Sequence, residues 1–532
     1  MTRARDLASH AVEGARRLSQ SALWRLQRRF YAHRGPQAWL ADKLPWYVTG
    51  NSFVAASFAR VALGFLRDCH AGRLGPLDPS RPIDFVELGA GPGHFAFLFT
   101  ESLLALKAAV PELARLRVRC VMTDLAAANV AAWRRQPTLA ALAARGLVDF
   151  ATLDAERGGE LALQASGETL RAGEAANPVF AVASYLFDSL AQDLFWIDGN
   201  ELVEAALSLH SDRPEDLEGQ DPELLSRLEL RYEPRPVSLP YYGDAALDGV
   251  LEGYRERLGN GGFLLPVGAI AVLRNARRLL GPRLLLLAAD KGDVEESEVL
   301  SRGTPQLTLH RGCFSLGVNF HALGRVVEQE GGEMLSTTGH DRRLRVVALL
   351  LGATGDAFAE TRLAFQDSVA RFSPLDYFAL SHHVRGAPQK PPLDAALALL
   401  RLGEGDARLF VTLASAIAER CAAAPVGLRR DLLREMDRAA ARFFPMSDDL
   451  PFELGRVAAR LGRPLEALRF FVQSMRQFGT SPAALFNAAL CLRALGERTE
   501  ALRLLERALE LEPSFAAAGE WCARLRSEAN AG

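Results

Sequence analysis

The sequence lacks the cysteine pattern, the long apolar runs and the leader that mark several protein classes. Its 532 residues include only six cysteines, none of them in C-x-x-C spacing, so the sequence indicates neither a zinc site nor a disulfide framework. No run reaches the roughly 18 apolar residues of a membrane helix. The N-terminus is rich in arginine, but Asp6 and Glu13 interrupt it and no apolar segment follows, which argues against a secretory signal. We therefore expect a cytoplasmic protein without a metal site or a membrane partner.

An excess of charge of one sign is also lacking. The 62 lysine and arginine residues are nearly balanced by 64 aspartate and glutamate residues, and the formal net charge is −2. The whole molecule therefore offers no electrostatic basis for binding nucleic acid or an anionic membrane. With 49% apolar residues the chain can bury more than one core, and its length predicts about two to four domains.

A glycine-rich turn is the most informative segment of the chain. Residues 83–88 read I-D-F-V-E-L, which predicts a strand, and glycines follow at alternate positions. Glycine lets the backbone approach a ligand where a Cβ would collide with it, so the turn is typical of a nucleotide pocket. A dinucleotide fingerprint, G-x-G-x-x-G, would need glycine where His94 stands. The pattern is instead E-x-G-x-G-x-G, formed by Glu87, Gly89, Gly91 and Gly93.

This pattern resembles motif I of the class I methyltransferases that depend on S-adenosylmethionine (SAM), in which the loop holds the methionine part of the cofactor. The resemblance implies SAM as cofactor. The three glycines would let the loop approach it, and Glu87 would order the loop or bind the methionine amino group. A tight turn in another kind of α/β domain is the alternative interpretation.

Two further strands end in a carboxylate. Residues 116–124 read L-R-V-R-C-V-M-T-D and residues 147–154 read L-V-D-F-A-T-L-D, as buried strands of a parallel sheet do. Asp124 is the candidate for binding ribose, because an ionised carboxylate only accepts hydrogen bonds and two adjacent hydroxyls can donate them. Its alternative role is to cap the following helix. Asp154 is a candidate for lying beside adenine, with a helix cap or a solvated turn as the alternative.

Alternating strands and helices predict the fold class. Residues 1–80 read as a helical segment that covers the cofactor domain, and residues 81–385 as an α/β domain with a β-rich insertion. Strands at 334–338 and 344–351 would close the sheet with an antiparallel hairpin. This layout resembles that of a class I methyltransferase domain, which implies a Rossmann-like, seven-stranded sheet. The loop from Pro45 to Ser52 either folds over the SAM pocket or only connects two helices.

The remainder predicts an all-α domain. A proline-rich linker at residues 386–393 precedes a helical region at 394–532. Two sequence pairs recur in that region at an interval of 34 residues: Leu461-Gly462 with Leu495-Gly496, and E-A-L at 466–468 with E-A-L at 500–502. This is the period of the tetratricopeptide repeat (TPR), in which each helix pair buries its apolar face on a neighbour. TPR-like helices suggest a protein or peptide partner by analogy.

A more specific resemblance starts at the end of the fourth strand. Residues 183–190, A-S-Y-L-F-D-S-L, look like the A-N-E-F-F-D-A-L-P segment of the MidA-like methyltransferases, a family that includes mitochondrial complex I assembly-factor methyltransferases. Residues 289–292 and 317–320 are similar to that family's D-Y-G and H-V-D-F motifs, and they occur in the same order. The resemblance covers about residues 40–350. It implies methyl transfer from SAM, in one branch of the family to arginine of a protein substrate.

The same segment provides the candidate acceptor site. Asp188 is the candidate for binding or deprotonating the methyl acceptor, and Tyr185 and Phe187 would shape the entrance or, alternatively, pack in the core. The family's glutamate is replaced here by Tyr185 and its proline by Ala191. Because a guanidinium is best held by carboxylates, this loss weakens the arginine assignment. Methyl transfer itself is affected less, since it chiefly needs alignment of nucleophile, methyl and sulfonium.

Three functions are compatible with these features. A SAM-dependent methyltransferase whose TPR-like tail recruits a protein substrate is favoured. A binding or assembly protein, whose SAM fold has lost turnover and whose tail carries the interaction, is the alternative. An NAD-dependent oxidoreductase is disfavoured by His94 and because Asp124 lies further along the chain than the usual interval of about 20 residues. The sequence predicts no oligomeric state.

Overall fold

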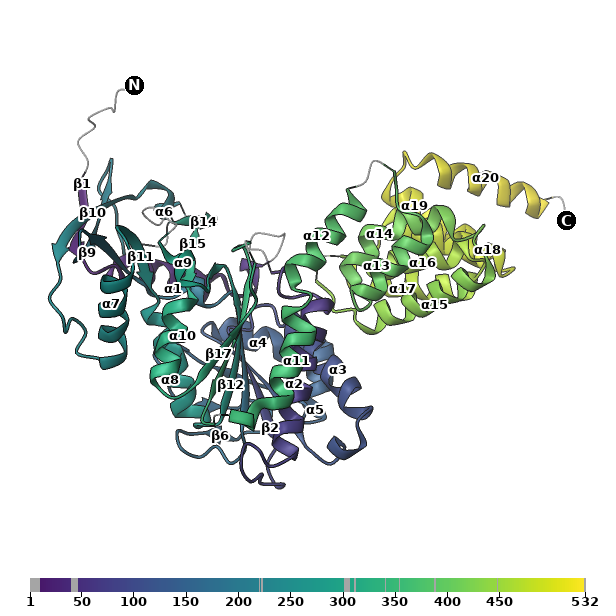
Figure 1. Ribbon diagram of the computed structural model, residues 1–532. Helices are drawn as coiled ribbons and strands as arrows, with labels where there is room; N and C mark the ends of the chain where they lie inside the picture. Colours follow the sequence, from purple (N-terminus) through teal and green to yellow (C-terminus); the bar gives the residue numbers. More distant parts are fainter. Residues whose placement is uncertain are drawn as a thin grey trace. The chain divides into compact units, whose positions relative to one another are not determined.

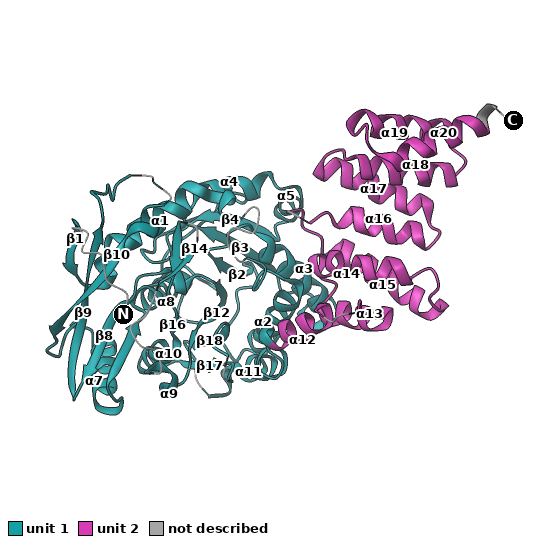
Figure 2. Ribbon diagram, turned by 90° about the horizontal axis from the view of Figure 1, so that it is seen from above, with its two compact units in different colours: residues 1–375 teal, residues 376–532 magenta. Residues whose placement is uncertain are grey.

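A computed structural model describes residues 10–39, 46–219, 221, 223–300, 307–310, 312–339, 341–353, 355–386, 389–446 and 448–530. The chain divides into two compact units, residues 1–375 and residues 376–532 (Figure 2). The boundary between the two units lies within helix α12 (Pro374–Arg385). It therefore precedes the expected linker at residues 386–393. Residues 387–388 of the expected linker and Pro45 of the expected loop lie outside the described residues.

A seven-stranded sheet forms the centre of the first unit (Figure 1). The strand order is β17-β18-β12-β7-β2-β3-β4, and only β18 runs antiparallel to the others. The order and the closing hairpin confirm the predicted Rossmann-like class I methyltransferase fold. The strands are β2 (Ile83–Leu88), β3 (Val118–Asp124), β4 (Val148–Thr152), β7 (Val179–Ser184), β12 (Leu284–Asp290), β17 (Glu333–Ser336) and β18 (Arg345–Leu351).

Helices cover both faces of this sheet, which is why its strands are apolar almost throughout. On one face Phe85 packs against Phe99 and Phe180, with ring centroids 5.6 and 5.3 Å away. On the other face Val86 shares a core with Leu273 and Leu323. The first face is covered by α2 (Ser52–His70), α3 (His94–Ala108) and α11 (Ala359–Phe365), and the second by α8 (Val267–Leu280) and α10 (Phe320–Gln329) (Figure 1).

The β-rich insertion forms a second, antiparallel sheet together with the N-terminal segment. Its strands are β1 (His10–Arg16), β8 (Asp193–Asp198), β9 (Glu201–Ser211), β10 (Glu229–Pro236) and β11 (Gly261–Leu265). The described part of the N-terminal segment, which was expected to be helical, therefore starts with a strand. β1 pairs with β9, whose edge supplies the backbone partners. Glu13 of β1 is buried and accepts hydrogen bonds from Ser21 Oγ (2.7 Å) and Ala22 N (3.0 Å), which holds the start of helix α1 (Ala22–Arg34).

Shorter elements complete the first unit. The remaining helices are α4 (Ala127–Arg135), α5 (Pro137–Ala144), α6 (Leu224–Arg227), α7 (Ala245–Arg257) and α9 (Glu296–Val299). The remaining strands are β5 (Leu161–Ala162), β6 (Thr169–Leu170), β13 (Gly292–Asp293), β14 (Thr308–His310), β15 (Cys313–Ser315) and β16 (Val318–Asn319).

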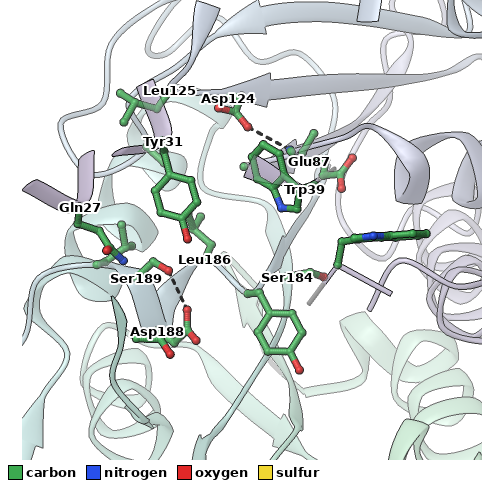
Figure 3. Close-up of a pocket in the computed structure, with 18 of the residues that line it drawn as sticks. Gln27, Tyr31, Trp39, Glu87, Asp124, Leu125, Ser184, Leu186, Asp188 and Ser189 are labelled. Atoms are coloured by element: carbon green, nitrogen blue, oxygen red, sulfur yellow. Dashed lines mark hydrogen bonds between the residues drawn. The ribbon is translucent and has the colours of Figure 1, made fainter. Parts of the chain in front are cut away.

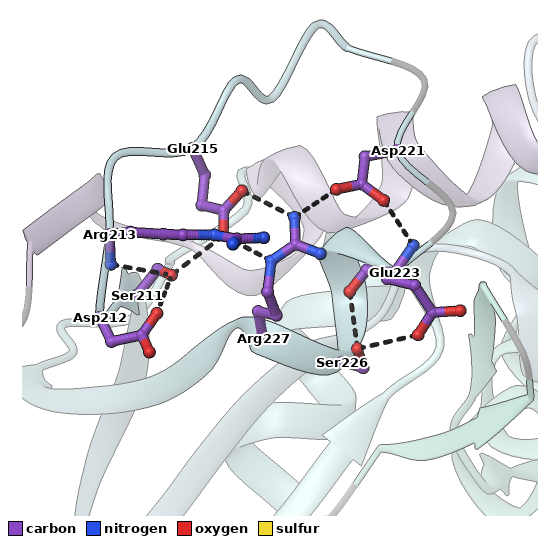
Figure 4. Close-up of polar contacts among 8 residues, drawn as sticks. All are labelled: Ser211, Asp212, Arg213, Glu215, Asp221, Glu223, Ser226 and Arg227. Atoms are coloured by element: carbon purple, nitrogen blue, oxygen red, sulfur yellow. Dashed lines mark hydrogen bonds and ion pairs between the residues drawn. The ribbon is translucent and has the colours of Figure 1, made fainter.

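An ion-pair cluster holds the connection between β9 and β10 (Figure 4). Arg227 donates from Nε and Nη2 to the two carboxylate oxygens of Glu215, at 2.7 and 2.8 Å, and also to Asp221. Arg213 donates to Glu215 as well. These hydrogen bonds, the one from Arg227 first, lower the pKa of Glu215 to about 2.

The second unit consists of helical hairpins. Its helices are α13 (Leu393–Leu402), α14 (Ala407–Arg420), α15 (Val426–Ala441), α16 (Leu450–Arg460), α17 (Pro464–Phe478), α18 (Pro482–Ala494), α19 (Arg498–Leu511) and α20 (Ala516–Asn530). The predicted 34-residue repeat corresponds to two hairpins, α16–α17 and α18–α19. Gly462 and Gly496 occupy equivalent turns with φ of 72° and 90°, a conformation that glycine adopts without a Cβ penalty. In the described part of the chain, no helix is long and apolar enough to cross a membrane.

Candidate functional site

A cavity opens at the carboxyl ends of the parallel strands, where open α/β sheets bind their ligands (Figure 3). It contains about 1430 Å³ of empty space, its open mouth included. This is ample for a ligand of nucleoside size. Most of the predicted site residues line it, namely Glu87, Gly89, Gly91, Asp124, Asp154, Tyr185 and Asp188.

The glycine-rich turn forms the floor of this cavity. Gly89, Gly91 and Gly93 have φ of 72°, 51° and 81°, so all three adopt the left-handed conformation that side chains disfavour. A Cβ on Gly91 would lie 3.1 Å from Trp39 Cζ2, on the cavity side of the loop. A Cβ on Gly93 would lie 2.8 Å from Met122 Cε, in the core behind the loop. Gly91 therefore lets Trp39 lie close to the loop at the cavity wall, whereas Gly93 lets the loop pack closely on Met122 of β3.

Asp124 ties the end of β3 to the glycine-rich turn. Its Oδ2 accepts a hydrogen bond from Gly91 N at 3.0 Å and its Oδ1 accepts one from Ala126 N at 2.8 Å. Helix α4 starts only at Ala127 and has no side-chain cap, so Asp124 shapes the turn instead of capping that helix. Burial raises the pKa of Asp124, and its hydrogen bonds oppose this effect. A carboxylate can accept about four hydrogen bonds, so both oxygens retain capacity for a ligand.

Glu87 places a second carboxylate in the cavity wall. The side chain is buried, and its Oε2 has no hydrogen-bond partner among the described residues. Burial raises the pKa of Glu87 well above its ordinary value, and the nearby charge of Asp124 raises it further. A buried acceptor without a partner is costly, by roughly 1–3 kcal/mol. A ligand that donates a hydrogen bond, above all a cationic one, would relieve this cost.

Helix α1 covers the cavity and changes the surroundings of Asp154. Arg28 donates to Asp154 Oδ2 and to Glu156 Oε2, the latter at 2.7 Å. Gln27 holds the same helix against β15, through hydrogen bonds in both directions with the backbone of Phe314. Asp154 is therefore neither a simple helix cap nor a solvated turn residue, because an arginine from a distant segment pairs with it. No local sequence pattern indicates this pairing, since 126 residues separate the two partners.

The loop after Trp46 also closes over the cavity. Trp46, Thr49 and Gly50 line it. His94, the first residue of α3, is buried, and its Nδ1 donates to Gly50 O at 2.7 Å. Of the two interpretations of this loop, the described residues agree with the one in which it folds over the pocket.

The fourth strand delivers the candidate acceptor residues. β7 ends at Ser184, and Tyr185 follows with φ of 49°, a strained conformation for a residue other than glycine. Tyr185 lines the cavity, whereas Phe187 is fully buried in the core, so the two aromatic residues separate. Asp188 is buried at the cavity wall and accepts a hydrogen bond from Ser189 Oγ at 2.9 Å (Figure 3).

A polar cluster from three other elements lies at the same end of the cavity. Lys291 follows β12, and its Nζ donates to Ser315 Oγ of β15 at 2.5 Å. Ser315 Oγ also hydrogen-bonds with His310 Nε2 at 2.9 Å. None of the three was given a role from the sequence: Lys291 lies in the segment that resembles D-Y-G, whereas His310 and Ser315 belong to no motif. Among the described residues no group of three or more His, Cys, Asp or Glu side chains could hold a metal ion.

Comparison with known proteins gives few matches. A family model described as tetratricopeptide repeat matches residues 482–515, which span α18 and α19. No curated protein matches the chain.

Solved structures resemble the chain weakly. The chain is similar to a COG1565 superfamily member from Burkholderia thailandensis bound to S-adenosyl-homocysteine, at 17% identity and a TM-score of 0.39, over 65% of this chain and 91% of that chain. An uncharacterized COG1565 superfamily protein from the same organism gives 15% identity and a TM-score of 0.39, over 65% and 90% of the two chains. The pyocyanin biosynthetic protein PhzM gives 13% and 0.25, over 54% and 55%. At these values neither ligand nor reaction transfers to this chain by similarity.

Proposed function

We propose that the first unit is a SAM-dependent methyltransferase. The observation that carries this proposal is the buried Oε2 of Glu87, which has no hydrogen-bond partner among the described residues and lines a cavity beside a glycine-rich turn. A methionine ammonium group supplies the charge-assisted hydrogen bond that this carboxylate lacks. The predicted E-x-G-x-G-x-G resemblance points to the same cofactor.

The residues present fit that cofactor at three places. Gly91 presents only backbone to the cavity, beside Trp39, whose Cζ2 would lie 3.1 Å from a Cβ at this position. Asp124 keeps acceptor capacity for the two ribose hydroxyls. Asp154 lines the same cavity but is paired with Arg28, so we assign it the structural role of holding α1 over the cofactor, with adenine contact as a secondary role.

The chemistry needs few protein groups. Bound SAM supplies a methyl group on a sulfonium, and the chain must hold the acceptor in line with it. Asp188 lies in the cavity wall, fixed by Ser189, and is the proposed group for binding or deprotonating the acceptor. Tyr185, held in a strained conformation beside it, is the proposed shaping residue.

The substrate class and the family membership are supported by other observations than the cofactor. A protein or peptide substrate, recruited through the TPR-like helices of the second unit, is supported by the matched repeat at residues 482–515. Membership of the MidA-like family and an arginine acceptor rest on the sequence resemblance alone. An assembly protein that binds SAM without turnover is the competing possibility.

The test is a pair of measurements on the full chain. Titration calorimetry with SAM and S-adenosylhomocysteine (SAH) should show saturable binding at one site. Glu87→Gln keeps the shape of the side chain but removes its charge, and it should weaken binding by about tenfold or more, because charged hydrogen bonds contribute roughly 1.5–3 kcal/mol. Unchanged affinity in Glu87→Gln would contradict the assignment. SAH binding without methyl transfer to any offered protein would favour the assembly function.

A further inference from the structure

The acceptor end of the cavity contains a cation held in place by hydrogen bonds. Lys291 Nζ donates to Ser315 Oγ at 2.5 Å and to Thr308 Oγ1 at 3.3 Å. Ser315 is buried and lines the cavity, as does His310, whose Nε2 lies 2.9 Å from Ser315 Oγ. The hairpin of β14 and β15 thus fixes the ammonium of Lys291 behind the wall of the cavity.

Backbone hydrogen bonds join this cluster to Asp188. Leu316 N donates to Asp188 O at 2.9 Å, which anchors the end of β15 on the acceptor residue. Asp290 bridges from the other side, since its two oxygens accept from Asp188 N and from Lys291 N, each at 3.0 Å. Asp188, Asp290, Lys291 and Ser315 therefore form one connected polar group.

The ammonium of Lys291 opposes the charge of Asp188. Burial raises the pKa of Asp290 well above its ordinary value, and the charge of Asp188 raises it further. Burial raises the pKa of Asp188 too, but Lys291 and the hydrogen bonds of Ser189 and Ser315 oppose this effect. Burial and the charge of Lys291 lower the pKa of His310. Of the two carboxyl groups only Asp188 lines the cavity, whereas Asp290 is fully buried and its oxygens accept from two backbone N–H groups.

The other charged groups of the cavity wall already have their own roles. Arg28 is paired with Asp154 and Glu156. Glu87 and Asp124 lie at the glycine-rich turn, where the proposed cofactor binds. Tyr31, Tyr185 and Cys313 also lie near Asp188, and they stay neutral because burial raises the pKa of each. A cationic acceptor would consequently find the charge of Asp188 opposed by the ammonium of Lys291, and it would also be repelled by Lys291.

We propose that the acceptor end of the cavity takes an uncharged hydrogen-bonding acceptor, a hydroxyl or an amide, instead of a guanidinium or ammonium cation, and that Lys291 sets this preference. The inference rests on the proposed function for the statement that this end of the cavity holds the acceptor. In the transfer, the acceptor oxygen or nitrogen forms a bond to the methyl carbon, the bond from that carbon to sulfur breaks, and its electron pair stays on sulfur as SAH leaves. The proton that the acceptor loses passes to Asp188. The proposal replaces the arginine acceptor that the family resemblance implies.

Two probes of matched shape test it. Nα-acetyl-argininamide ends in a guanidinium, and Nα-acetyl-citrullinamide ends in an uncharged urea of the same size. Each is titrated into the SAH-loaded full chain, and the ratio of the two affinities is the readout. The wild type should bind the citrulline probe at least as tightly as the arginine probe. Lys291→Met should shift the ratio toward arginine by about tenfold or more, since it leaves Asp188 uncompensated.

Control variants separate charge from shape. Lys291→Arg keeps the cation and should keep the wild-type ratio. Lys291→Gln replaces Lys291→Met if the latter does not fold, and the same shift is expected. Three results would overturn the proposal: a wild type that prefers arginine by more than about tenfold, a ratio unchanged when the charge of Lys291 is removed, or no binding of either probe.

The same measurements test the methyltransferase assignment separately from the acceptor class. If SAH does not bind, the methyltransferase assignment is wrong, while the ratio of the two probes can still be measured on the unloaded chain. If SAH binds and the ratio favours arginine, the methyltransferase assignment stands and only the acceptor class is wrong.

Discussion

Replacing Asp124 with alanine should weaken both the fold and the cofactor site, by amounts that the structure allows us to work out. The carboxylate is only 6% exposed and accepts two backbone N–H groups, from Gly91 and Ala126. Asp124→Ala leaves both donors buried without a partner. At roughly 1–3 kcal/mol for each unsatisfied group, the free energy of unfolding should fall by about 2–6 kcal/mol.

Asp149 offers a matched control on the next strand. Its side chain is 1% exposed and accepts hydrogen bonds from the backbone N–H groups of Phe150, Ala165 and Ser166, at 2.8, 2.8 and 3.1 Å. It does not line the cavity. Asp149→Ala should therefore destabilise the first unit by a similar amount and leave SAH affinity unchanged.

The assay combines urea unfolding with SAH titration under conditions in which both variants are folded. Asp124→Ala should lose at least about tenfold in SAH affinity relative to Asp149→Ala, because a charged acceptor for the ribose hydroxyls contributes roughly 1.5–3 kcal/mol. The reasoning is refuted if the two variants bind SAH within about twofold of each other. It is equally refuted if Asp124→Ala unfolds at the wild-type urea concentration.

Three further outcomes follow from particular residues. Gly496→Val should lower the melting temperature of the second unit without changing SAH affinity, because φ is 90° in that turn; an unchanged melting profile would contradict the repeat geometry. Asp290 has a raised pKa in the folded state, so the stability it contributes is full below its ordinary pKa of about 3.9 and is lost as pH rises through the raised value. Asp290→Asn should flatten that fall in the stability profile, and a profile that keeps its slope would exclude Asp290 as the source. NMR titration should find Glu215 ionising near pH 2, and Arg227→Gln should move its pKa up toward the ordinary range; a pKa that stays near 2 in the variant would show that Arg227 is not the cause.

The core of the fold could be predicted from the sequence because several local sequence patterns indicate the same helices and strands there. Residues 83–88, which the sequence predicts as a strand, form β2 with the same bounds. The closing hairpin at 334–338 and 344–351 corresponds to β17 and β18 within one or two residues. Apolar periodicity, glycine placement and strand length all depend on neighbouring residues, so one sequence suffices to read them.

Contacts between residues far apart in the chain could not be predicted in the same way. β1 forms a strand because it pairs with the edge of β9, about 200 residues further along the chain. No local sequence pattern indicates that this edge is available. Asp154 was predicted to lie beside adenine, to cap a helix or to lie in a solvated turn, and its pairing with Arg28 of the covering helix was not predicted. The cluster of Lys291, His310 and Ser315 depends on the β14–β15 hairpin bringing separate segments together. The sequence could predict which acids and glycines belong to the candidate site, but it could not predict which side chains surround them.

Titration of SAH into the full chain, with Gly91→Val beside the wild type, tests the central claim most directly. A valine at Gly91 would need φ of 51° and would point its side chain at Trp39 in the cavity. The account predicts saturable binding at one site in the wild type and its loss in Gly91→Val, while both proteins keep a cooperative unfolding transition. A folded wild type that binds neither SAH nor SAM, or a Gly91→Val variant that binds as the wild type does, would contradict it.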